Sequence, residues 1–477
     1  MRRFFTISLI SLAGIALCSC ATSVKQKAIE TLDVPKNWQS KPNSEYSDKN
    51  ETRTKNLTGA FTNASWLDYF ENNTQLQSLI QEGILSNKDL AIASARVDKA
   101  QAELRTVQPN RLPTIDINGQ GRRQKFNDAT AATLSGVARS DDYTANLGLR
   151  WEIDLWGSLR NQVQFSRSQL ESSQANLKYA QMSIASQIAK TWLSIMHIEG
   201  QISLLEEHQT LQNLYLKSIE ERYRRGLIFA EQFLYESNKT QAIYESLNEL
   251  YNERDQLHRS LAVLMGEYPK AEALEYQPLP DFLDSIPAGI PSDLLLNRPD
   301  LIAMERQLAG SRVLLKSAKK QRLPKISLTG AMGNASPELN NLINSSNAFW
   351  NVGVNLSQPL INYGRINANI RASKAQLAEA EATYEKVILN AFMEVENTLS
   401  NDSYLQTIRN SNTQVLNQAE EIASMNQTKY LEGNGAFLNY LSAKIASLQS
   451  QREHLQINYN QLKNRINLYL ALGYSFI

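Results

Sequence analysis

Cysteine is almost absent from the sequence, which limits the ways in which the fold can be stabilised. Only two of the 477 residues are cysteines, Cys18 and Cys20, and both lie close to the N-terminus. A disulfide framework joins paired cysteines across a fold, so none is expected here. Stability must therefore come from the packing of helices and strands.

Long apolar runs and an excess of one charge are also missing. Beyond the N-terminal segment, no run reaches the roughly 18 apolar residues that a membrane-spanning helix requires. This excludes a bundle of such helices. The 49 basic and 48 acidic residues leave a net charge of +1. A chain so close to neutral gives no indication of a nucleic-acid partner.

Catalytic and metal-binding motifs are missing as well. The histidines show neither metal-ligand spacing nor an HExxH motif, and the sequence contains no P-loop and no G-x-S-x-G turn. We expect the histidines on solvated faces of helices. The sequence favours a protein that is not an enzyme and holds no metal or cofactor within its fold. The four histidines are His197, His208, His258 and His454.

The N-terminal segment, MRRFFTISLISLAGIALCSCATS, has the order of a secretory signal: two arginines, a short apolar stretch and small residues. It resembles a bacterial lipoprotein signal, in which the cysteine after the cleavage site carries covalent lipid. Ser19 before Cys20, with Leu17 three residues back, favours Cys20 over Cys18 as the lipidated residue. An ordinary secretory leader with incidental cysteines is the alternative.

The chain repeats itself. NKDLAIASARVDKAQAELRTVQPNRLPTIDINGQG begins at Asn87, and NRPDLIAMERQLAGSRVLLKSAKKQRLPKISLTGAMG begins at Asn297. The two stretches share identical residues at a constant offset along the chain, starting with the pair Asp89 and Asp300. Later matches keep a slightly shifted spacing, so two copies of one unit make up most of the chain. These later matches pair Gly157, Tyr223, Gly226 and Gly266 with Gly364, Tyr430, Gly433 and Gly473.

Each copy has the same internal order. A helical stretch ends at RLP, where proline disfavours helix in the preceding residue. Two stretches of alternating apolar and polar residues follow and are predicted to be strands. A long helix comes next, then a turn at glycine and a shorter returning helix. The predicted strands are Thr114–Phe126, Tyr143–Leu155, Lys325–Ala335 and Phe349–Leu360, and the long helices are Leu159–Arg225 and Arg365–Glu432.

The predicted lengths favour an extended helical assembly. At 1.5 Å per residue, each long helix spans about 100 Å. The returning helices, and the helix before the first RLP, each span about 55 Å. Alanine, glutamate and leucine are abundant in the second long helix, as in long exposed helices. A hollow assembly of helices fits these lengths better than a continuous core within one chain.

The strands have two different faces. In DYTANLGLRWEIDLWGSL, the apolar Trp151, Ile153 and Leu155 point one way, because alternate residues of a strand face opposite sides. The polar Arg150, Glu152 and Asp154 point the other way, as do Asn351 and Asn355 in the second copy. Lipid against the apolar face would leave these five residues lining a lumen. A soluble sandwich core is the alternative, but no spare element remains to cover the apolar face.

Contact with lipid would require the sheet to close on itself. Unpaired strand edges are not stable in hydrocarbon. Four strands from one chain are too few, and eight strands from two chains would give a barrel filled by side chains. A conduit therefore requires at least three chains. The strand count does not distinguish three from four.

Several stretches together resemble the TolC-type outer-membrane factors, in particular the lipidated branch with OprM and NodT-like proteins. They are WLDYF at Trp66, NKDLAIASARV at Asn87, WEIDLWG at Trp151, IPSDLLLNRPDL at Ile290 and the two Tyr-x-x-Gly turns. The resemblance implies a mostly α protein with a transmembrane β-barrel. It also implies a homotrimer whose 12-stranded β-barrel sits in the outer membrane on a 12-helix periplasmic α-barrel.

The resemblance also implies a function and partners. Such proteins are passive exit ducts, docked to a periplasmic adaptor and to an inner-membrane pump of the RND type or another kind. Some relatives export copper or silver, but the eight methionines here are scattered, which does not favour metal export. Outer-membrane lipid is the remaining partner, and nucleic acid is not one.

The repeat and the resemblance together divide the chain into five parts. These are 1–19, a lipoprotein signal peptide; 20–70, an N-terminal anchor and equatorial segment; 71–266, the first repeat; 267–296, a linker in the equatorial collar; and 297–477, the second repeat with a C-terminal equatorial segment.

The resemblance further implies a gate at the periplasmic tip, about 100 Å from the strands. The helix pair after the second turn closes the tube in this family, and the matching positions are Leu438, Asn439 and Ser442. The family often has acids at the last two positions, so weaker cation selectivity is expected here. The tip turns are Tyr223, Gly226, Tyr430 and Gly433, and charged neighbours of the turns are Arg224, Arg225 and Glu432.

Two other classes of protein remain as alternatives. A soluble coiled-coil scaffold explains the long helices but not the leader or the strands. A trimeric, lipid-anchored surface protein without a transport role explains the leader and strands. Such a protein would need a dedicated binding region, and the loops 122–142 and 333–348 are merely polar.

Overall fold

The computed structural model describes residues 38–40, 73–125, 127, 139–280 and 297–474. They form two compact units. The helical unit contains the described residues up to Ser94, those within Ala175–Ile302 and those from Glu385 on. The strand unit contains Ala95–Gln174 and Ala303–Tyr384. The cysteines, the WLDYF stretch and residues 281–296 of the linker lie outside the described residues.

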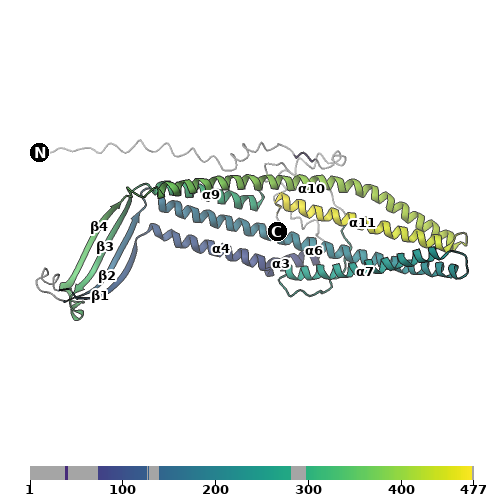
Figure 1. Ribbon diagram of the computed structural model, residues 1–477, viewed down its shortest axis with the longest axis horizontal. Coiled ribbons are helices and arrows are strands. Elements are labelled where there is room, and N and C mark those ends of the chain that lie inside the picture. The colour runs from purple at the N-terminus through teal and green to yellow at the C-terminus, as the bar shows by residue number, and fades with distance from the viewer. Residues whose placement is uncertain (1–37, 41–72, 126, 128–138, 281–296, 475–477) are drawn as a thin grey trace. The chain divides into compact units, whose positions relative to one another are not determined.

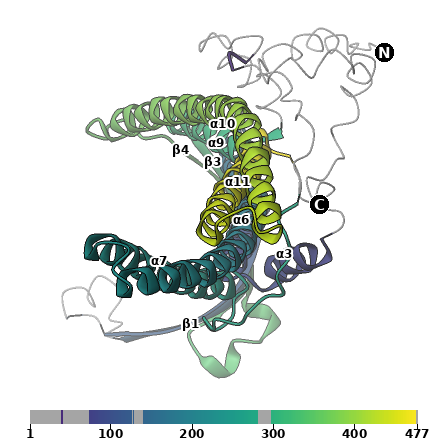
Figure 2. The same ribbon diagram turned by 90° about the vertical axis from the view of Figure 1, so that its right-hand side faces the viewer.

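The helical unit is built from two helix hairpins. Helix α6 (Ser158–Arg224) is followed by α7 (Ala230–Leu264), and α10 (Arg365–Leu431) by α11 (Phe437–Leu472). Both long helices have 67 residues and begin in the strand unit. The predicted long helices are thus confirmed to within one residue at each end. Figures 1 and 2 show α7 beside α6 and α11 beside α10.

Helix α6 is covered on two sides. Leu205 of α6 packs against Ile243 and Leu247 of α7. On the α11 side, the Ser194 hydroxyl lies 2.8 Å from the Tyr459 hydroxyl, and the Lys444 ammonium of α11 lies 3.2 Å from the Glu207 carboxylate of α6. The expectation of exposed long helices therefore fails for this part of α6.

The core of this unit surrounds Trp192. Its side chain is fully buried, and the indole Nε1 donates a hydrogen bond of 2.9 Å to Gln75 Oε1 of α3 (Thr74–Ser86). Leu193 and Met196 are equally buried and extend the apolar surface along α6. Burying a large apolar side chain stabilises a fold by about 1.5–3 kcal/mol, so this cluster is a main source of stability.

The prediction of solvated histidines is wrong for three of the four. His197, His208 and His258 are buried at 4%, 9% and 4% exposure. The His197 ring stacks on Tyr459 at 4.5 Å between centroids, and its Nε2 lies 3.0 Å from Gln456 Oε1. His197 and His208 lie on α6 and His258 on α7, and neighbouring elements cover the faces of these helices that carry them.

The helix expected before the first RLP is two helices. The chain breaks at the buried Asn87, between α3 and α4 (Lys88–Val107), where ψ is 132°. The Asn87 Oδ1 atom accepts hydrogen bonds from the N–H groups of Asp89 and Leu90 and thereby caps α4. Its Nδ2 donates to the Leu264 carbonyl at 2.8 Å. Asparagine therefore ends one helix, starts another and fixes the end of α7.

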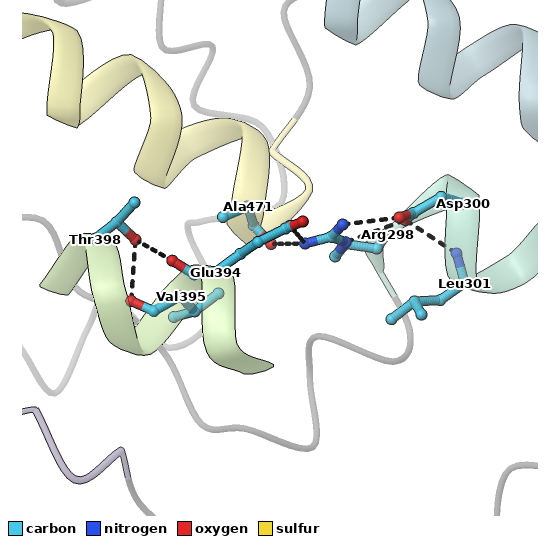
Figure 3. Close-up of polar contacts among 7 residues, drawn as sticks. All are labelled: Arg298, Asp300, Leu301, Glu394, Val395, Thr398 and Ala471. Carbon is cyan, nitrogen blue, oxygen red and sulfur yellow. Dashed lines mark hydrogen bonds and ion pairs between the residues drawn. The ribbon is translucent and has the colours of Figure 1, made fainter. Parts of the chain in front are cut away.

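Arg298 has the same position in the second copy, two residues before Asp300 as Asn87 is two before Asp89. It precedes α9 (Pro299–Lys320) and is 3% exposed. Its guanidinium group donates to the Ala471 carbonyl of α11 at 3.1 Å, to Glu394 at 2.7 Å and to Asp300 (Figure 3). Both copies thus join the start of one helix to the end of the returning helix.

Three residues of the predicted N-terminal equatorial segment are described. Trp38 packs edge-on against Phe392 of α10, with 6.0 Å between the ring centroids. The backbone N–H groups of Gln39 and Ser40 both donate to the Glu396 carboxylate at 2.8 Å. This short segment is therefore held on α10 by one ring contact and one carboxylate.

The strand unit contains a four-stranded antiparallel sheet in the order β1-β2-β3-β4. Figure 1 shows the strands side by side in chain order. All four predicted strands are confirmed, with ends that differ by a few residues. The short helix η3 (Gln108–Arg111) precedes the sheet, and η4 (Leu339–Asn341) and η5 (Ser345–Asn347) lie between β3 and β4. The strands are β1 (Thr114–Lys125), β2 (Arg139–Ile153), β3 (Lys325–Ser336) and β4 (Ala348–Ser357).

Helices α4, α6, α9 and α10 all contribute segments to the strand unit. Gly310 of α9 lies against the Phe165 ring and Ser168 of α6. The Arg312 guanidinium of α9 lies 3.2 Å from the Glu381 carboxylate of α10. Helix α9 therefore packs on both long helices. No helix in the described part of the chain is long and apolar enough to cross a membrane.

Candidate functional site

The first candidate site is the apolar face of the sheet. The register places apolar residues of all four strands on the same side. Several of them are largely exposed, and Trp350 retains 78% of its accessible surface. Monomeric soluble proteins rarely expose an apolar patch of this extent. The largest exposed members are Ile115, Ile117, Met332, Trp350, Val352, Val354 and Leu356.

The opposite face of the sheet is polar. Arg150 pairs with Thr329, Glu152 with Ser327, and Ser327 with Asn355, so the register places Arg150, Glu152 and Asn355 on one side. Asn351 follows on the same side through its partner Ala331. The Lys325 ammonium lies 3.8 Å from the Glu152 carboxylate. Four of the five residues predicted to line a lumen therefore share a face.

The structure places Asp154 differently. Strand β2 ends at Ile153, and the Asp154 carboxylate accepts hydrogen bonds from the Leu159 and Arg160 N–H groups at 3.0 and 2.8 Å. The Arg160 side chain lies 3.5 Å away. A carboxylate at a helix N-terminus satisfies free N–H groups and meets the positive end of the helix dipole. Asp154 thus caps α6 after the strand.

Two tryptophans fix the ends of strands near the helices. Trp151 Nε1 donates to the Arg111 carbonyl at 3.0 Å, and Trp156 Nε1 donates to the Pro324 carbonyl at 2.7 Å. Each indole therefore bonds to the RLP stretch of one copy. Side chains with an apolar ring and a polar N–H are typical of the boundary between lipid and water.

The second candidate site is the pair of hairpin turns. Gly226 and Gly433 have φ of 71° and 77°, in the left-handed region that favours glycine. At the first turn, Gly226 N–H donates to the Tyr223 carbonyl and Leu227 N–H to the Arg222 carbonyl. The second turn repeats both bonds, so each long helix ends in a Schellman motif.

The tyrosines of the Tyr-x-x-Gly turns support the returning helices. Tyr223 stacks on Phe233 of α7 at 5.4 Å between centroids. Tyr430 stacks on Tyr440 of α11 at 5.8 Å and also contacts Phe437. The repeated tyrosine therefore positions the start of each returning helix.

The predicted gate residues lie in the first turns of α11. Asn439 and Ser442 are exposed, and Leu438 is half-buried. Ala446 and Gln449 are also exposed and lie on the same face as Asn439 and Ser442, at helical spacing. The Ser442 hydroxyl donates to the Asn439 carbonyl at 3.1 Å. The exposed start of α11 is thus neutral and polar, with Leu438 at its margin.

The charged residues at the turns differ in their contacts and exposure. Arg224 Nη2 lies 2.6 Å from Glu220 Oε1, one helical turn earlier. Arg225 and Glu432 are exposed at the ends of their helices. Leu227 and Phe229, between α6 and α7, are 64% and 89% exposed. The first turn therefore presents apolar side chains together with a basic one.

Within the part of the chain that the structure describes, no group of His, Cys, Asp and Glu side chains could hold a metal ion. Sequence reasoning missed the cluster around Arg298. The Asn-Arg-Pro-Asp stretch at its centre served only as part of a family motif, and it was the signal that could have pointed to the cluster. The predicted lipidation site, Cys20 or alternatively Cys18, lies outside the described residues.

Comparisons with known proteins agree with this geometry. The family model described as outer membrane efflux protein matches residues 79–267 and 290–474. The cation efflux system protein CusC of Escherichia coli O6:H1 is 27% identical over 440 residues, covering 88% of this chain and 90% of CusC. The toluene efflux pump outer membrane protein TtgI of Pseudomonas putida is 28% identical over 421 residues, covering 85% and 86%.

A solved structure shows the same architecture. The open state of the MtrE outer membrane channel of Neisseria gonorrhoeae superimposes with a TM-score of 0.71 at 27% identity. The match covers 84% of this chain and 89% of that channel.

Proposed function

The chain belongs to the outer membrane efflux protein family, whose members are channels, and we propose that three copies of it form a passive exit duct for small molecules. The duct leads from the periplasm through the outer membrane. It carries compounds that a periplasmic adaptor and an inner-membrane pump deliver. The protein itself catalyses no reaction.

The observation that carries this proposal is the two-faced sheet. One face is apolar and exposed on all four strands, and the other is polar. A closed barrel in a membrane has this arrangement, with its apolar side toward lipid and its polar side toward a lumen. A sheet that packs on a soluble core would bury its apolar face, and within the described residues nothing covers it.

The number of copies follows from the width of the lumen. Twelve strands from three chains leave an open bore, whereas eight strands are filled by side chains. Closure also removes the free edges of β1 and β4, whose backbone groups have no partner in hydrocarbon. Arg150, Glu152, Asn351 and Asn355 then line the lumen of the barrel.

The periplasmic end is the regulated part of the duct. The start of α11 narrows the tube there, with Leu438, Asn439 and Ser442 forming a ring contributed by all copies. The ring carries no formal charge, so packing and neutral hydrogen bonds hold it closed. The adaptor docks at the two hairpin turns, the first of which exposes Leu227 and Phe229.

The N-terminus anchors the duct to the membrane through lipid on Cys20, with Cys18 as the alternative site.

The names of the relatives CusC and TtgI refer to cations and toluene. Their cargo differs although the family is the same, so the family does not identify the cargo of this chain. The specificity of such a system resides in the pump and the adaptor, because a wide passive tube selects little.

A pair of neighbouring residues on β4 tests the proposal. Lysine at Val352 would face lipid, where a charge near the bilayer centre costs about 2–4 kcal/mol per copy. Lysine at Asn351 would face the lumen at little cost. We expect Val352→Lys to abolish the heat-modifiable trimer in outer-membrane extracts, and Asn351→Lys to retain it.

Transport is tested separately by deleting the gene and measuring sensitivity to toxic compounds. An inserted trimer whose deletion changes no sensitivity would favour the surface or scaffold role. Equal assembly of Val352→Lys and Asn351→Lys would contradict the membrane barrel itself.

A further inference from the structure

The apolar face of the sheet becomes basic toward the ends of β1 and β2 that lie away from the helices. Along β2, the residues on this face run from Ile153 through Leu147 to Tyr143, and then to Asp141 and Arg139. On β1, the residues paired with the last two are Arg123 and Lys125. Three cations and one carboxylate therefore follow directly after the apolar surface. We call Arg123, Lys125 and Arg139 the basic patch.

Within the part of the chain that the structure describes, only one of the three cations of this patch has an ion-pair partner. Arg123 forms a bidentate ion pair with Asp141, at 2.8 Å from Nε and 2.6 Å from Nη2. Lys125 and Arg139, in contrast, are direct cross-strand partners. Like charges opposite one another destabilise a sheet. Among the described residues neither side chain has an ion-pair partner, so an external anion would relieve the repulsion.

The other face of the same strands shows no such excess. There Arg122 is the direct cross-strand partner of Asp142, one residue away from the Arg123 and Asp141 pair. Opposite charges face one another on this side, and the pair is neutral as a whole. The excess of positive charge is thus confined to the face that is apolar elsewhere.

The position of the patch matches the depth of lipid headgroups. Ten residues separate Ile153 from Tyr143, which is about 33 Å along the strand. With a strand tilt of about 40°, the apolar surface is about 25 Å high, the height of the apolar band of membrane barrels. Measured in the same way across the membrane, Arg139 lies about 10 Å further out than Tyr143. This places it beyond the hydrocarbon and among the headgroups.

We propose that the basic patch binds the phosphate of anionic lipid headgroups in the outward-facing leaflet of the outer membrane. This inference rests on the proposed function, because that function puts lipid on the apolar face and the helices in the periplasm. A phosphate between Lys125 and Arg139 accepts hydrogen bonds from both and removes their mutual repulsion. The patch then fixes the height of the barrel in the membrane.

Lipid binding to the full-length trimer in detergent tests the proposal. Phosphatidylglycerol is titrated and counted by native mass spectrometry, with zwitterionic phosphatidylcholine and inorganic phosphate as comparison ligands. Each basic residue near an anionic lipid contributes about a factor of five in affinity. We expect Lys125→Gln with Arg139→Gln to weaken phosphatidylglycerol binding about 25-fold.

Two matched variants sharpen the test. Arg122→Gln removes a cation from the polar face and should change the affinity less than about twofold, because it lies outside the patch. Asp141→Asn adds net positive charge to the patch and should strengthen binding. Unchanged affinity in the double variant, or an equal loss in Arg122→Gln, would overturn the proposal. Inorganic phosphate that binds as tightly as the lipid would assign the patch to a soluble anion instead.

The same preparations separate this inference from the proposed function. Heat-modifiable migration and conductance in a planar bilayer show whether a trimeric pore forms. A conducting trimer without preference for phosphatidylglycerol refutes only the lipid site. A protein that forms no trimer and no pore refutes the proposed function.

Discussion

Arg298 joins three helices through one guanidinium group: the start of α9, the middle of α10 and the end of α11. It bonds to Asp300 at the start of α9, to Glu394 of α10 and to the last turn of α11 at Ala471. Gly473, which ends α11 with a φ of 76°, lies so close that a Cβ there would be 3.0 Å from the Arg298 backbone. In the first copy the neutral Asn87 makes the corresponding bond to the end of α7. The two copies therefore link the same helix ends, one through a guanidinium group and the other through an amide.

Replacement of Arg298 by methionine should therefore destabilise the helical unit. It leaves the Asp300 carboxylate without its ion-pair partner and the Ala471 carbonyl without the guanidinium donor, at a cost of about 3 kcal/mol. The matched control is Arg306→Met, because the Arg306 ion pair with Glu171 is 3.4 Å long and its side chain is 44% exposed. We expect a loss below about 1 kcal/mol there. Thermal unfolding in detergent measures the loss of stability in both variants. Equal unfolding midpoints of Arg298→Met and Arg306→Met would contradict the role of Arg298.

The buried histidines give the helical unit a dependence on pH. Burial, together with the nearby positive charges of Lys239 and Arg452, lowers the pKa of His208 to about 4. Burial also lowers the pKa of His197 to about 4, although the hydrogen bond to Gln456 Oε1 acts in the opposite direction and raises it. Among the residues that the structure describes, neither nitrogen of His208 has a hydrogen-bond partner.

The sign of the effect follows from proton binding. The unfolded chain binds a proton at His208 near pH 6.5, and the folded chain only near pH 4. The stability from the neutral ring is thus complete above about pH 6.5 and is lost as the pH falls toward 4. We expect His208→Gln to flatten the fall of the melting temperature across this range. Identical slopes in His208→Gln and in the unsubstituted protein would rule out His208 as the cause.

At the scale of elements, the two hairpins are built alike and end differently. Both long helices have the same length and the same Schellman motif. The returning helix α7 starts with Glu231 in its first turn, whereas α11 has no acid in its first turn. The exposed line through Asn439 and Ser442 is also neutral, so the proposed gate would differ from the acidic rings that the family resemblance implies.

A negative charge at the start of α11 should change the ion preference of the pore. Asn439→Asp would place one carboxylate per copy on the exposed line, and carboxylate rings attract cations. We expect a higher ratio of cation to anion permeability in planar bilayers. Gln449→Asp lies about 15 Å along the same helix and should have a smaller effect. Unchanged preference in Asn439→Asp would remove this residue from the constriction.

At the scale of the whole molecule, the sheet of a single chain lacks, among the residues that the structure describes, partners for its edges and a cover for its apolar face. Its sheet has two free edges, at β1 and β4, and an exposed apolar face. Both features are costly in water, and both are resolved when copies close into a barrel within lipid. Assembly and membrane insertion are thus parts of the same step.

The proposed lipid anchor would be a second connection between the molecule and the membrane. We expect Cys20→Ala to abolish labelling of the protein by radioactive palmitate, because no acceptor thiol then follows the cleavage site. Cys18→Ala should retain the label. Trimers should form in both variants, since the barrel holds them in the membrane. Label lost only in Cys18→Ala would move the anchor to that residue.

The features that the sequence predicted well are those set by short-range periodicity. Alternation placed Trp350 and Val352 on one face and Asn351 on the other, and the register of the sheet agrees. Proline-free stretches between glycines placed α6 and α10 to within one residue. These patterns are readable because the period of a strand or helix follows from backbone geometry alone.

The features decided only by the tertiary structure involve residues far apart in the chain. His197 meets Gln456, Asn87 meets Leu264, and Arg298 meets Ala471 across more than 170 residues in each case. Helical periodicity states which residues share a face, but not which face a neighbouring helix will cover. The buried histidines, the break at Asn87 and the capping role of Asp154 therefore depended on packing and local hydrogen bonds that no periodic pattern encodes.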